Sequence, residues 1–280
     1  MAISVLTNVP SLFAQKNLAK TQSSLQSSIG KLSSGLRINN AADDAAGLGI
    51  SENLKSDIRS LAQAQRNAND GISLTQVAEG GMNEMQGLVT RMRELAVQSA
   101  NQTLGSTERG YIQTEFGQLR NEVNRISAVT EFNGQKLLDG SASAGLSFQV
   151  GMQNTANDRL SMSVTKLTAS TLGSTSLHVA SATLSTVTGA RNALGVFDKA
   201  IEQLSTARSK VGAVQNRMQV TISNLSTAHE NLSAANSRIR DVDVASETAN
   251  LTKSQILSQA GLAVLAQANQ LPSAALSLLG

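Results

Sequence analysis

The sequence predicts a mainly α protein: a long antiparallel helical hairpin or coiled-coil bundle, with a small β-hairpin near the middle of the chain. Both ends carry apolar residues at three- and four-residue spacings, the pattern of an amphipathic helix that needs a partner. The only prolines are Pro10 and Pro272, so the chain between them lacks the residue that most disfavours helices. Aromatic residues make up 2% of the chain, which favours narrow seams of aliphatic side chains over a thick core.

The first predicted helix carries a coiled-coil seam. Its apolar residues follow at spacings of 7, 4, 3 and 4: Leu18, Leu25, Ile29, Leu32 and Leu36. The small, polar run from residue 41 to residue 47 then predicts a break in the helix.

A second helix is predicted from about Ser51 to Asn101, with a stripe that includes Met82, Met85, Val89, Met92 and Ala96. The pair Gly80-Gly81 is a weak point at which we expect a bend. Gly105 ends this helix, and a third helix follows with apolar residues at spacings of 4, 3, 4 and 3: Ile112, Phe116, Leu119, Val123 and Ile126.

The middle of the chain reads differently. Apolar residues alternate over 146–150 and again over 160–164, and a polar segment with Asn154 separates the two runs, which predicts a β-hairpin. The Ser- and Thr-rich stretch from Thr165 to Gly189 has no clear period, so we expect it to be irregular and to lie on the surface.

The helix after this stretch has the most regular pattern. Seven apolar residues are each seven positions apart: Phe197, Leu204, Val211, Met218, Leu225, Leu232 and Ile239. A last helix carries Leu257, Ala260, Val264, Ala268 and Leu271 on one face.

This order of elements predicts an antiparallel hairpin whose two chain ends lie side by side. Residues 1–45 and 236–280 are expected to form one discontinuous domain, and residues 46–235 a second domain with the β-hairpin around 146–164. Each end alone has too little apolar surface to offset the entropy lost on ordering. We therefore expect the ends to be loose in a monomer and ordered in an assembly.

Composition excludes several classes of protein. Cysteine is absent, so neither disulfides nor thiolate metal sites can form. The formal charge is only +3 and the basic residues are scattered, which argues against nucleic-acid binding. The chain has no apolar run of the roughly 18–20 residues that would insert into a membrane, and no basic leader of the kind that precedes a cleaved signal.

The residues that usually carry catalysis give no active-site pattern. The two histidines, His178 and His229, are far apart in sequence, and no phosphate-binding loop motif is present. Asp43-Asp44 and the pair Asp241 and Asp243 do not match a metal-binding loop, so we interpret them as turn and helix-cap residues. The sequence predicts a protein that is not an enzyme and has no catalytic residues, cofactor or metal.

Several motifs at the two ends resemble those of the bacterial flagellin family. The N-terminal motifs are KLSSGLRIN from Lys31, DDAAG from Asp43, RNANDGIS from Arg66 and RELAVQ from Arg93. The C-terminal motifs are SQIL from Ser254, QAG from Gln259, VLAQANQ from Val264 and LSLL from Leu276. The resemblance covers nearly the whole chain outside residues 141–189.

The resemblance implies a non-enzymatic subunit that polymerises into the extracellular flagellar filament for swimming. It implies export through the flagellar type III apparatus and partners that include an export chaperone, the filament cap and junction proteins. The terminal helices would form the inner tube, and the short central segment implies a core-only member without a large variable surface domain. We expect the assembly seams to include Leu25, Ile29, Leu32, Leu36, Leu257, Val264 and Leu271.

The resemblance also implies a contact with the mammalian Toll-like receptor that detects flagellin, at Arg91, Leu95 and Glu115. Ordinary contact between subunits is an alternative role for the same residues. Two alternatives to the filament subunit also stay open: a hook–filament junction protein, which shares the terminal helices, and a coiled-coil structural or adaptor protein.

Overall fold

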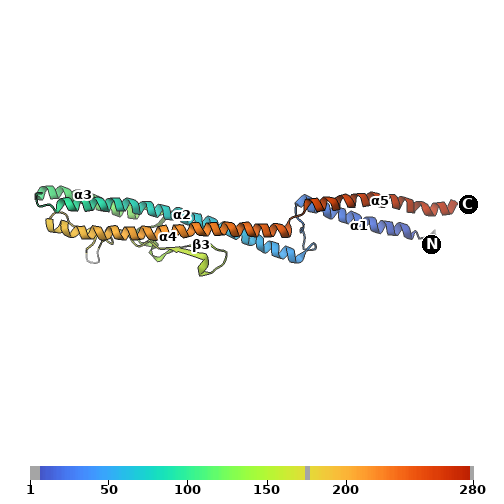
Figure 1. Ribbon diagram of the computed structural model, residues 1–280, viewed down its shortest axis with the longest axis horizontal. Helices are drawn as coiled ribbons and strands as arrows, with labels where there is room; N and C mark the ends of the chain where they lie inside the picture. Colours follow the sequence, from blue (N-terminus) through green and yellow to red (C-terminus); the bar gives the residue numbers. More distant parts are fainter. Residues whose placement is uncertain (1–6, 174–176, 278–280) are drawn as a thin grey trace. The chain divides into compact units, whose positions relative to one another are not determined.

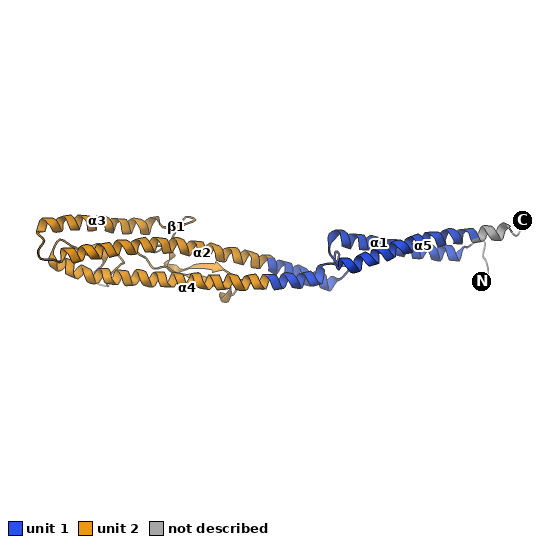
Figure 2. Cartoon of the chain, turned by 45° about the horizontal axis from the view of Figure 1, so that its top comes forward, with its two compact units in different colours: residues 1–58, 230–280 blue, residues 59–229 orange. Residues whose placement is uncertain are grey.

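The computed structural model describes residues 7–173 and 177–277 (Figure 1). It confirms the predicted fold class: five long helices account for most of the chain, with a small antiparallel hairpin in the middle. The chain divides into two compact units, drawn in different colours in Figure 2. The first combines residues 1–58 with 230–280 and the second spans 59–229, whereas the sequence placed the boundaries near residues 45 and 236.

The first unit contains α1 (Val9–Ser34) and α5 (Val244–Ser277), together with one end of α2 (Ala45–Ser99) and of α4 (Val187–Arg240). Pro10 lies in the first turn of α1, where its missing N–H would have had no partner in the helix. Gly35 ends α1 in the left-handed conformation, with a φ of 71°. Leu36 therefore lies beyond the helix rather than on its seam.

The second unit is built from the rest of α2 and α4 and from α3 (Ser106–Val129), which lies along α2 (Figures 1 and 2). The methionine stripe of α2 is fully buried in its core, as are Phe116 of α3 and Phe197 of α4. The rings of these two phenylalanines lie 5.8 Å apart between centroids. The predicted seven-residue repeat of α4 is buried from Phe197 to Leu225.

Among the described residues between α3 and α4, the chain forms two short antiparallel hairpins. The predicted one pairs β3 (Leu146–Gln149) with β4 (Arg159–Met162), and Phe148 lies opposite Leu160. A second, not predicted, pairs β1 (Glu131–Phe132) with β2 (Gln135–Lys136). Its turn residue Asn133 has a φ of 49° and Gly134 a φ of 78°, so the Asn-Gly dipeptide was the signal for it. The described part of this connection also contains three short 3₁₀ helices: η1 (Ser141–Ala144), η2 (Ala156–Asp158) and η3 (Val179–Ser181).

The described part of the stretch from Thr165 to Gly189 is mostly irregular, with η3 within it and the first residues of α4 at its end, but the prediction that it lies on the surface was wrong. Leu167, Leu172, Val179 and Leu184 are all buried in the core of the second unit. Side chains from the helices hold its backbone: Gln113 accepts the N–H of Leu184, and Gln203 bonds both the N–H and the carbonyl of Gly173. Here helix side chains satisfy backbone groups that a β-ladder would otherwise pair. The buried apolar residues therefore do not follow the period of a strand or a helix.

The sequence predicted a bend at Gly80-Gly81, and α2 continues as one helix through both residues. A Cβ atom on Gly81 would lie 2.8 Å from the Thr130 hydroxyl and 2.9 Å from a methyl group of Leu138. Gly81 thus lets the segment after α3 approach the backbone of α2.

Within residues 7–173 and 177–277, none of the helices is both long and apolar enough to cross a membrane.

The Phe116–Phe197 pair provides a test of the core. Phe116→Ala should lower the free energy of unfolding by about 3–5 kcal/mol, because it removes a fully buried ring and leaves a cavity. Tyr111→Ala, on the exposed side of the same helix, should change it by less than about 0.5 kcal/mol. Denaturant unfolding of both variants measures the difference. Equal losses of unfolding free energy would contradict the burial of Phe116 in the core.

Candidate functional site

The contact between α1 and α5 is made largely of small and polar side chains. The two helices run antiparallel and pack along their length. The most buried residues of this contact are Ser11, Ala14 and Ser28 on α1, and Ser254 and Ala268 on α5. Leu18, Leu25 and Leu32 are half-buried between them. The seam therefore buries little apolar surface for two helices of this length.

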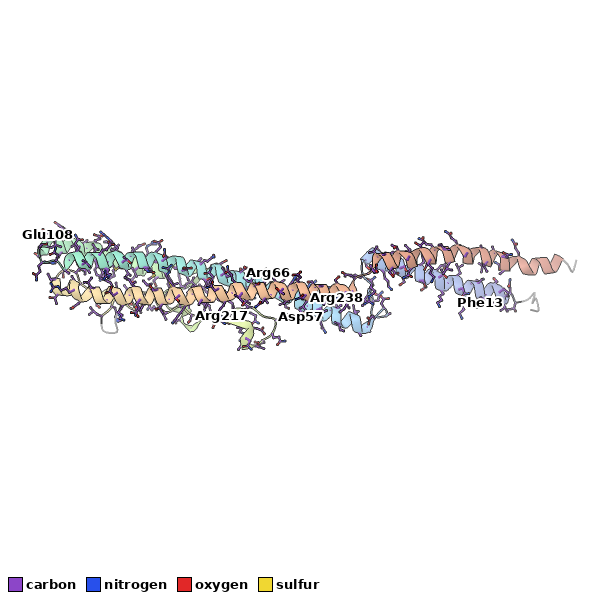
Figure 3. All side chains as sticks on the ribbon, in the orientation of Figure 1. Phe13, Asp57, Arg66, Glu108, Arg217 and Arg238 are labelled. Atoms are coloured by element: carbon purple, nitrogen blue, oxygen red, sulfur yellow. The ribbon has the colours of Figure 1, made fainter. Side chains whose placement is uncertain are left out.

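Large apolar side chains instead project from the other faces of α1 and α5. They are Val9, Leu12, Phe13 and Ile29 on α1, and Val244, Ile256, Leu257, Leu262 and Val264 on α5. Phe13, labelled in Figure 3, projects from α1 in this way. Because Leu251 and Leu265 are half-buried, α5 carries apolar groups on most of its circumference. A helix that is apolar all round is typical of a buried position.

The residues predicted as assembly seams separate into two groups. Leu25, Leu32 and Leu36 are half-buried within the unit, whereas Ile29, Leu257 and Val264 are 51%, 49% and 58% exposed. Leu271 belongs to α5, but its side chain lies outside the described residues. Whether these residues contact other copies stays a prediction.

An open groove of about 840 Å³ runs between α1 and α5. Phe13 and Leu18 line it from α1, and Leu257 and Val264 line it from α5. Lys20 and Lys253 also line this groove. The groove is thus mainly apolar, with two lysines among its lining residues, and it exposes side chains of both helices to solvent.

Hydrogen bonds are present at both ends of the contact between α1 and α5. At the chain termini, Asn8 Nδ2 donates to the carbonyl of Ala268 at 2.7 Å, and the Ser11 hydroxyl donates to Asn269 Oδ1 at 2.8 Å. At the other end, the N–H of Arg37 donates to the carbonyl of Arg240 at 2.6 Å. The same segments pair again where the N–H of Val242 donates to the carbonyl of Gly35 at 3.0 Å.

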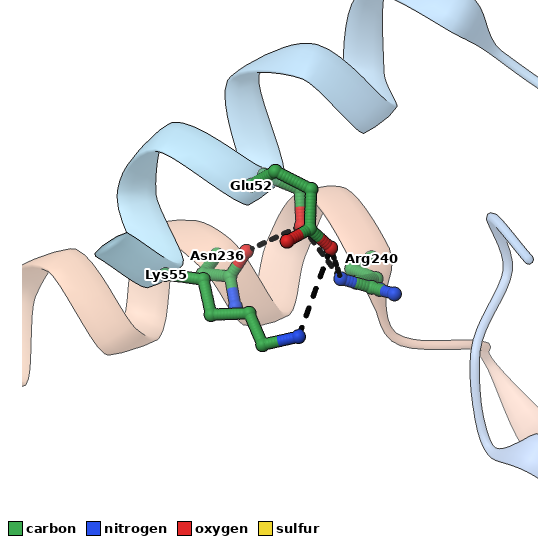
Figure 4. Close-up of polar contacts among 5 residues, drawn as sticks. Glu52, Lys55, Asn236 and Arg240 are labelled. Carbon is green, nitrogen blue, oxygen red and sulfur yellow. Dashed lines mark hydrogen bonds and ion pairs between the residues drawn. The ribbon is translucent and has the colours of Figure 1, made fainter. Parts of the chain in front are cut away.

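A polar cluster joins α2 to the end of α4 (Figure 4). Arg240 donates to Glu52 Oε1 at 2.6 Å, and buried Ser51 donates to Asn236 Oδ1 at 2.8 Å. The guanidinium of Arg240 lowers the pKa of Glu52, and the nearby charge of Lys55 adds to this effect. The bond to Ser51 thus gives the polar side chain of Asn236 a partner on α2.

Three of the four predicted acidic residues act as caps or turn residues, whereas Asp241 accepts the hydroxyl of Ser237 in α4. Asp43 accepts the N–H groups of Asn39 and Asn40, and these bonds lower its pKa. Asp44 accepts the N–H of Gly47 at the start of α2, and Asp243 accepts the N–H of Ala245 at the start of α5. Within residues 7–173 and 177–277, no group of three or more His, Asp or Glu side chains is placed to hold a metal ion.

The three residues of the predicted receptor contact lie together in the second unit. Arg91 of α2 donates to Glu115 Oε1 of α3 at 2.9 and 3.0 Å, and to Glu94 at 3.0 Å. These bonds, chiefly those to Glu115, raise the pKa of Arg91. Leu95 is 1% exposed and packs in the core, so only Arg91 and Glu115 present side chains to solvent.

Comparison with known proteins decides the family. Residues 5–143 match the model of the bacterial flagellin N-terminal helical region, and residues 194–279 match that of the C-terminal helical region. The chain belongs to the bacterial flagellin family. It is 45% identical to a flagellin of Halalkalibacterium halodurans and 44% identical to a flagellin of Bacillus subtilis strain 168. Each alignment covers 97% of this chain and 98% of the relative.

The fold has a counterpart among solved structures. This flagellin resembles a putative flagellar hook-associated protein from Vibrio parahaemolyticus with a TM-score of 0.59, over 71% of this chain and all of the other. The two are only 14% identical in sequence, so the likeness concerns the fold alone. The family matches favour a filament subunit over the junction protein that the sequence left open.

The residues that form hydrogen bonds between the helices were not predicted from the sequence. Asn8 could have been found, since an Asn two residues before a proline is a signal for a helix start. The bond from Arg240 to Glu52 joins residues 188 positions apart, and no local pattern signals such a pair.

The Glu52–Arg240 pair predicts a pH dependence. The folded pKa of Glu52 lies below its ordinary value of 4.5, so its contribution to stability is present above pH 4.5 and is lost as the pH falls through the folded pKa. Glu52→Gln should lower the thermal midpoint at pH 7, and its difference from the unmodified chain should shrink steadily below pH 4.5. Circular dichroism at a series of pH values measures this.

Glu230→Gln is the matched control, since it removes an exposed carboxylate from the same unit. A difference between Glu52→Gln and the unmodified chain that stays constant from pH 7 to pH 3 would contradict the assignment.

Proposed function

We propose that this flagellin joins the flagellar filament by burying the outward-facing apolar side chains of α1 and α5 against other copies of the chain. The supporting observation is the uneven distribution of apolar residues in the first unit. Its internal seam is small and polar, whereas Phe13, Ile29, Leu257 and Val264 project outward. Burial of apolar surface contributes about 25 cal/mol per Å², so these faces favour association.

The subunit is structural, and its assembly is a homopolymer. A surface that meets a different surface on the next copy, without closing a ring, produces an open helical polymer. In this proposal α1 and α5 form the inner tube, and the second unit, with its own core, forms the outer layer. Leu25 and Leu32 hold α1 to α5, while the exposed seam residues contact neighbouring copies.

Family membership supports the remaining parts of the proposal. The chain is exported through the flagellar apparatus with a dedicated chaperone, and it is added beneath the cap of a filament that junction proteins attach to the hook. Its location is then extracellular and its role is swimming motility. A coiled-coil adaptor of fixed size would instead cover its apolar faces within a closed oligomer.

Assembly through α5 predicts the effect of a single substitution. Val264→Gln should slow or abolish polymerisation, because it places an amide where a neighbour would bury an isopropyl group. Unfolding of the second unit should stay unchanged, because Val264 is not part of it. Val220→Gln removes an equally exposed valine from α4 and is the control. Sedimentation and electron microscopy of seeded samples measure polymer, and equal yields from both variants would argue against the proposal.

We also propose that Arg91 and Glu115 contact the Toll-like receptor that detects flagellin. Both side chains are about half exposed, and their mutual bonds hold them in one arrangement across α2 and α3. Leu95 then acts only by packing beneath them.

Arg91→Ala should reduce receptor activation at least about tenfold, the loss typical of an arginine at the centre of an interface. Arg125→Ala is the control, since Arg125 makes a similar exposed pair with Glu122 on α3. A reporter-cell assay compares the variants. Unchanged activation by Arg91→Ala would leave ordinary contact between subunits as the role of this pair.

A further inference from the structure

The end of the α1–α5 contact nearest the chain termini carries a group of directed hydrogen bonds. Asn8 serves both helices: its Oδ1 accepts the N–H of Ser11 at 3.1 Å, which caps α1, and its Nδ2 donates to the Ala268 carbonyl of α5 at 2.7 Å. Ser11 is buried, and its hydroxyl donates to Asn269 at 2.8 Å. We propose that Asn8, Ser11 and Asn269 form a clasp that fixes the register of α1 against α5. The inference rests on the proposed function, because this register decides which apolar groups face the neighbouring copies.

Packing along the seam carries little information about register. Leu18 lies over Gly261, with its Cδ1 atom 3.4 Å from the position that a Cβ on Gly261 would take. Ser254 and Ala268 are seven residues to either side of Gly261, and both are small and buried. A shift by one seven-residue repeat therefore again places Leu18 over a small residue. The packing of Leu18 therefore does not by itself distinguish the native register from one shifted by a repeat.

Directed hydrogen bonds distinguish the registers where burial does not. A shift of seven residues moves Asn8 and Ser11 away from the carbonyl and amide that they contact, and it leaves the buried Ser11 hydroxyl without this partner. Polar residues within a seam of apolar repeats set register in coiled coils in the same way. The clasp is thus the part of the contact that favours one alignment.

The backbone ties at the other end do not replace the clasp. They join residues 35–37 to residues 240–242, which lie in the connections or at the last turn of α4 rather than on α1 or α5. Connections can move while the helices that follow them slide. The clasp groups lie at the first turn of α1 and on α5 itself, so they act directly on the two helices.

Cysteine pairs can report the register, because the chain contains no cysteine of its own. In the pair Leu18→Cys and Gly261→Cys, the two Cβ positions lie 4.0 Å apart, within the range of about 3.5–4.5 Å that a disulfide needs. The pairs Leu18→Cys with Ser254→Cys, and Leu18→Cys with Ala268→Cys, report shifts of one repeat in either direction. Each full-length chain is polymerised and oxidised, and peptide mapping without reductant then identifies bonds within one chain.

In the otherwise unmodified chain, the 18–261 pair should form the disulfide and the two shifted pairs should not. Adding Asn8→Ser and Ser11→Ala should raise the ratio of shifted to native disulfide on the order of tenfold, from the loss of two directed bonds. Asn8→Ser keeps a capping hydroxyl, so loss of the cap is not the cause. Ser11→Thr keeps the donor and should retain the native pattern.

A native pattern in the Asn8→Ser, Ser11→Ala chain would overturn the clasp and leave the backbone ties as the source of register. If that chain does not sediment, the pairs are oxidised in the soluble chain: a retained 18–261 bond overturns the clasp, and its loss, with retention in the Ser11→Thr control, supports it. Failure of the proposed function is a separate result, since the chain without any clasp substitution would then not polymerise.

Discussion

The weakness of the contact between α1 and α5 governs the rest of the structure. A seam of Ser11, Ala14, Ser28 and Ser254 lets two helices approach closely but removes little apolar surface from water. Other large apolar side chains, which could have strengthened it, lie on the other faces of the same helices. The two helices are therefore joined by directed hydrogen bonds but share only a small hydrophobic core. Other copies of the chain can cover the apolar side chains that remain exposed.

The second unit, in contrast, has a large apolar core. Folding stability and assembly therefore depend on different parts of the chain. Three helices and the irregular stretch bury Met85, Phe116, Leu184 and Phe197 completely. Such a core supports folding without a partner, since fully buried aliphatic and aromatic side chains each contribute about 1.5–3 kcal/mol. The first unit can leave its apolar faces uncovered because the chain does not depend on them for a folded second unit.

The sequence predicted features that repeat and missed features that occur once. The seven-residue spacing from Phe197 to Leu225 located a buried face correctly, because one face of a helix returns at a fixed interval. The exposure of Ile29 next to half-buried Leu25 could not be predicted, since both fit one stripe and only the position of α5 selects between them. Leu184 was missed because it lies in no regular element, and its N–H is held by Gln113 of α3, which is distant in sequence.

Charge adds a second constraint on the terminal helices. Across their described ranges α1 and α5 carry Lys16, Lys20, Lys31 and Lys253 but a single acidic residue, Glu247. Like charges on faces that also carry Phe13 and Val264 oppose the association that the apolar groups favour, and the opposition acts within the screening length of about 8–10 Å. A neighbouring copy that covers the groove must place the ammonium groups of Lys20 and Lys253 against water or an acceptor while it buries the apolar walls. Since an alignment must meet both conditions, the lysines restrict the positions in which an apolar surface can be covered. The same chemistry that makes α1 and α5 prone to associate thus also makes their association selective.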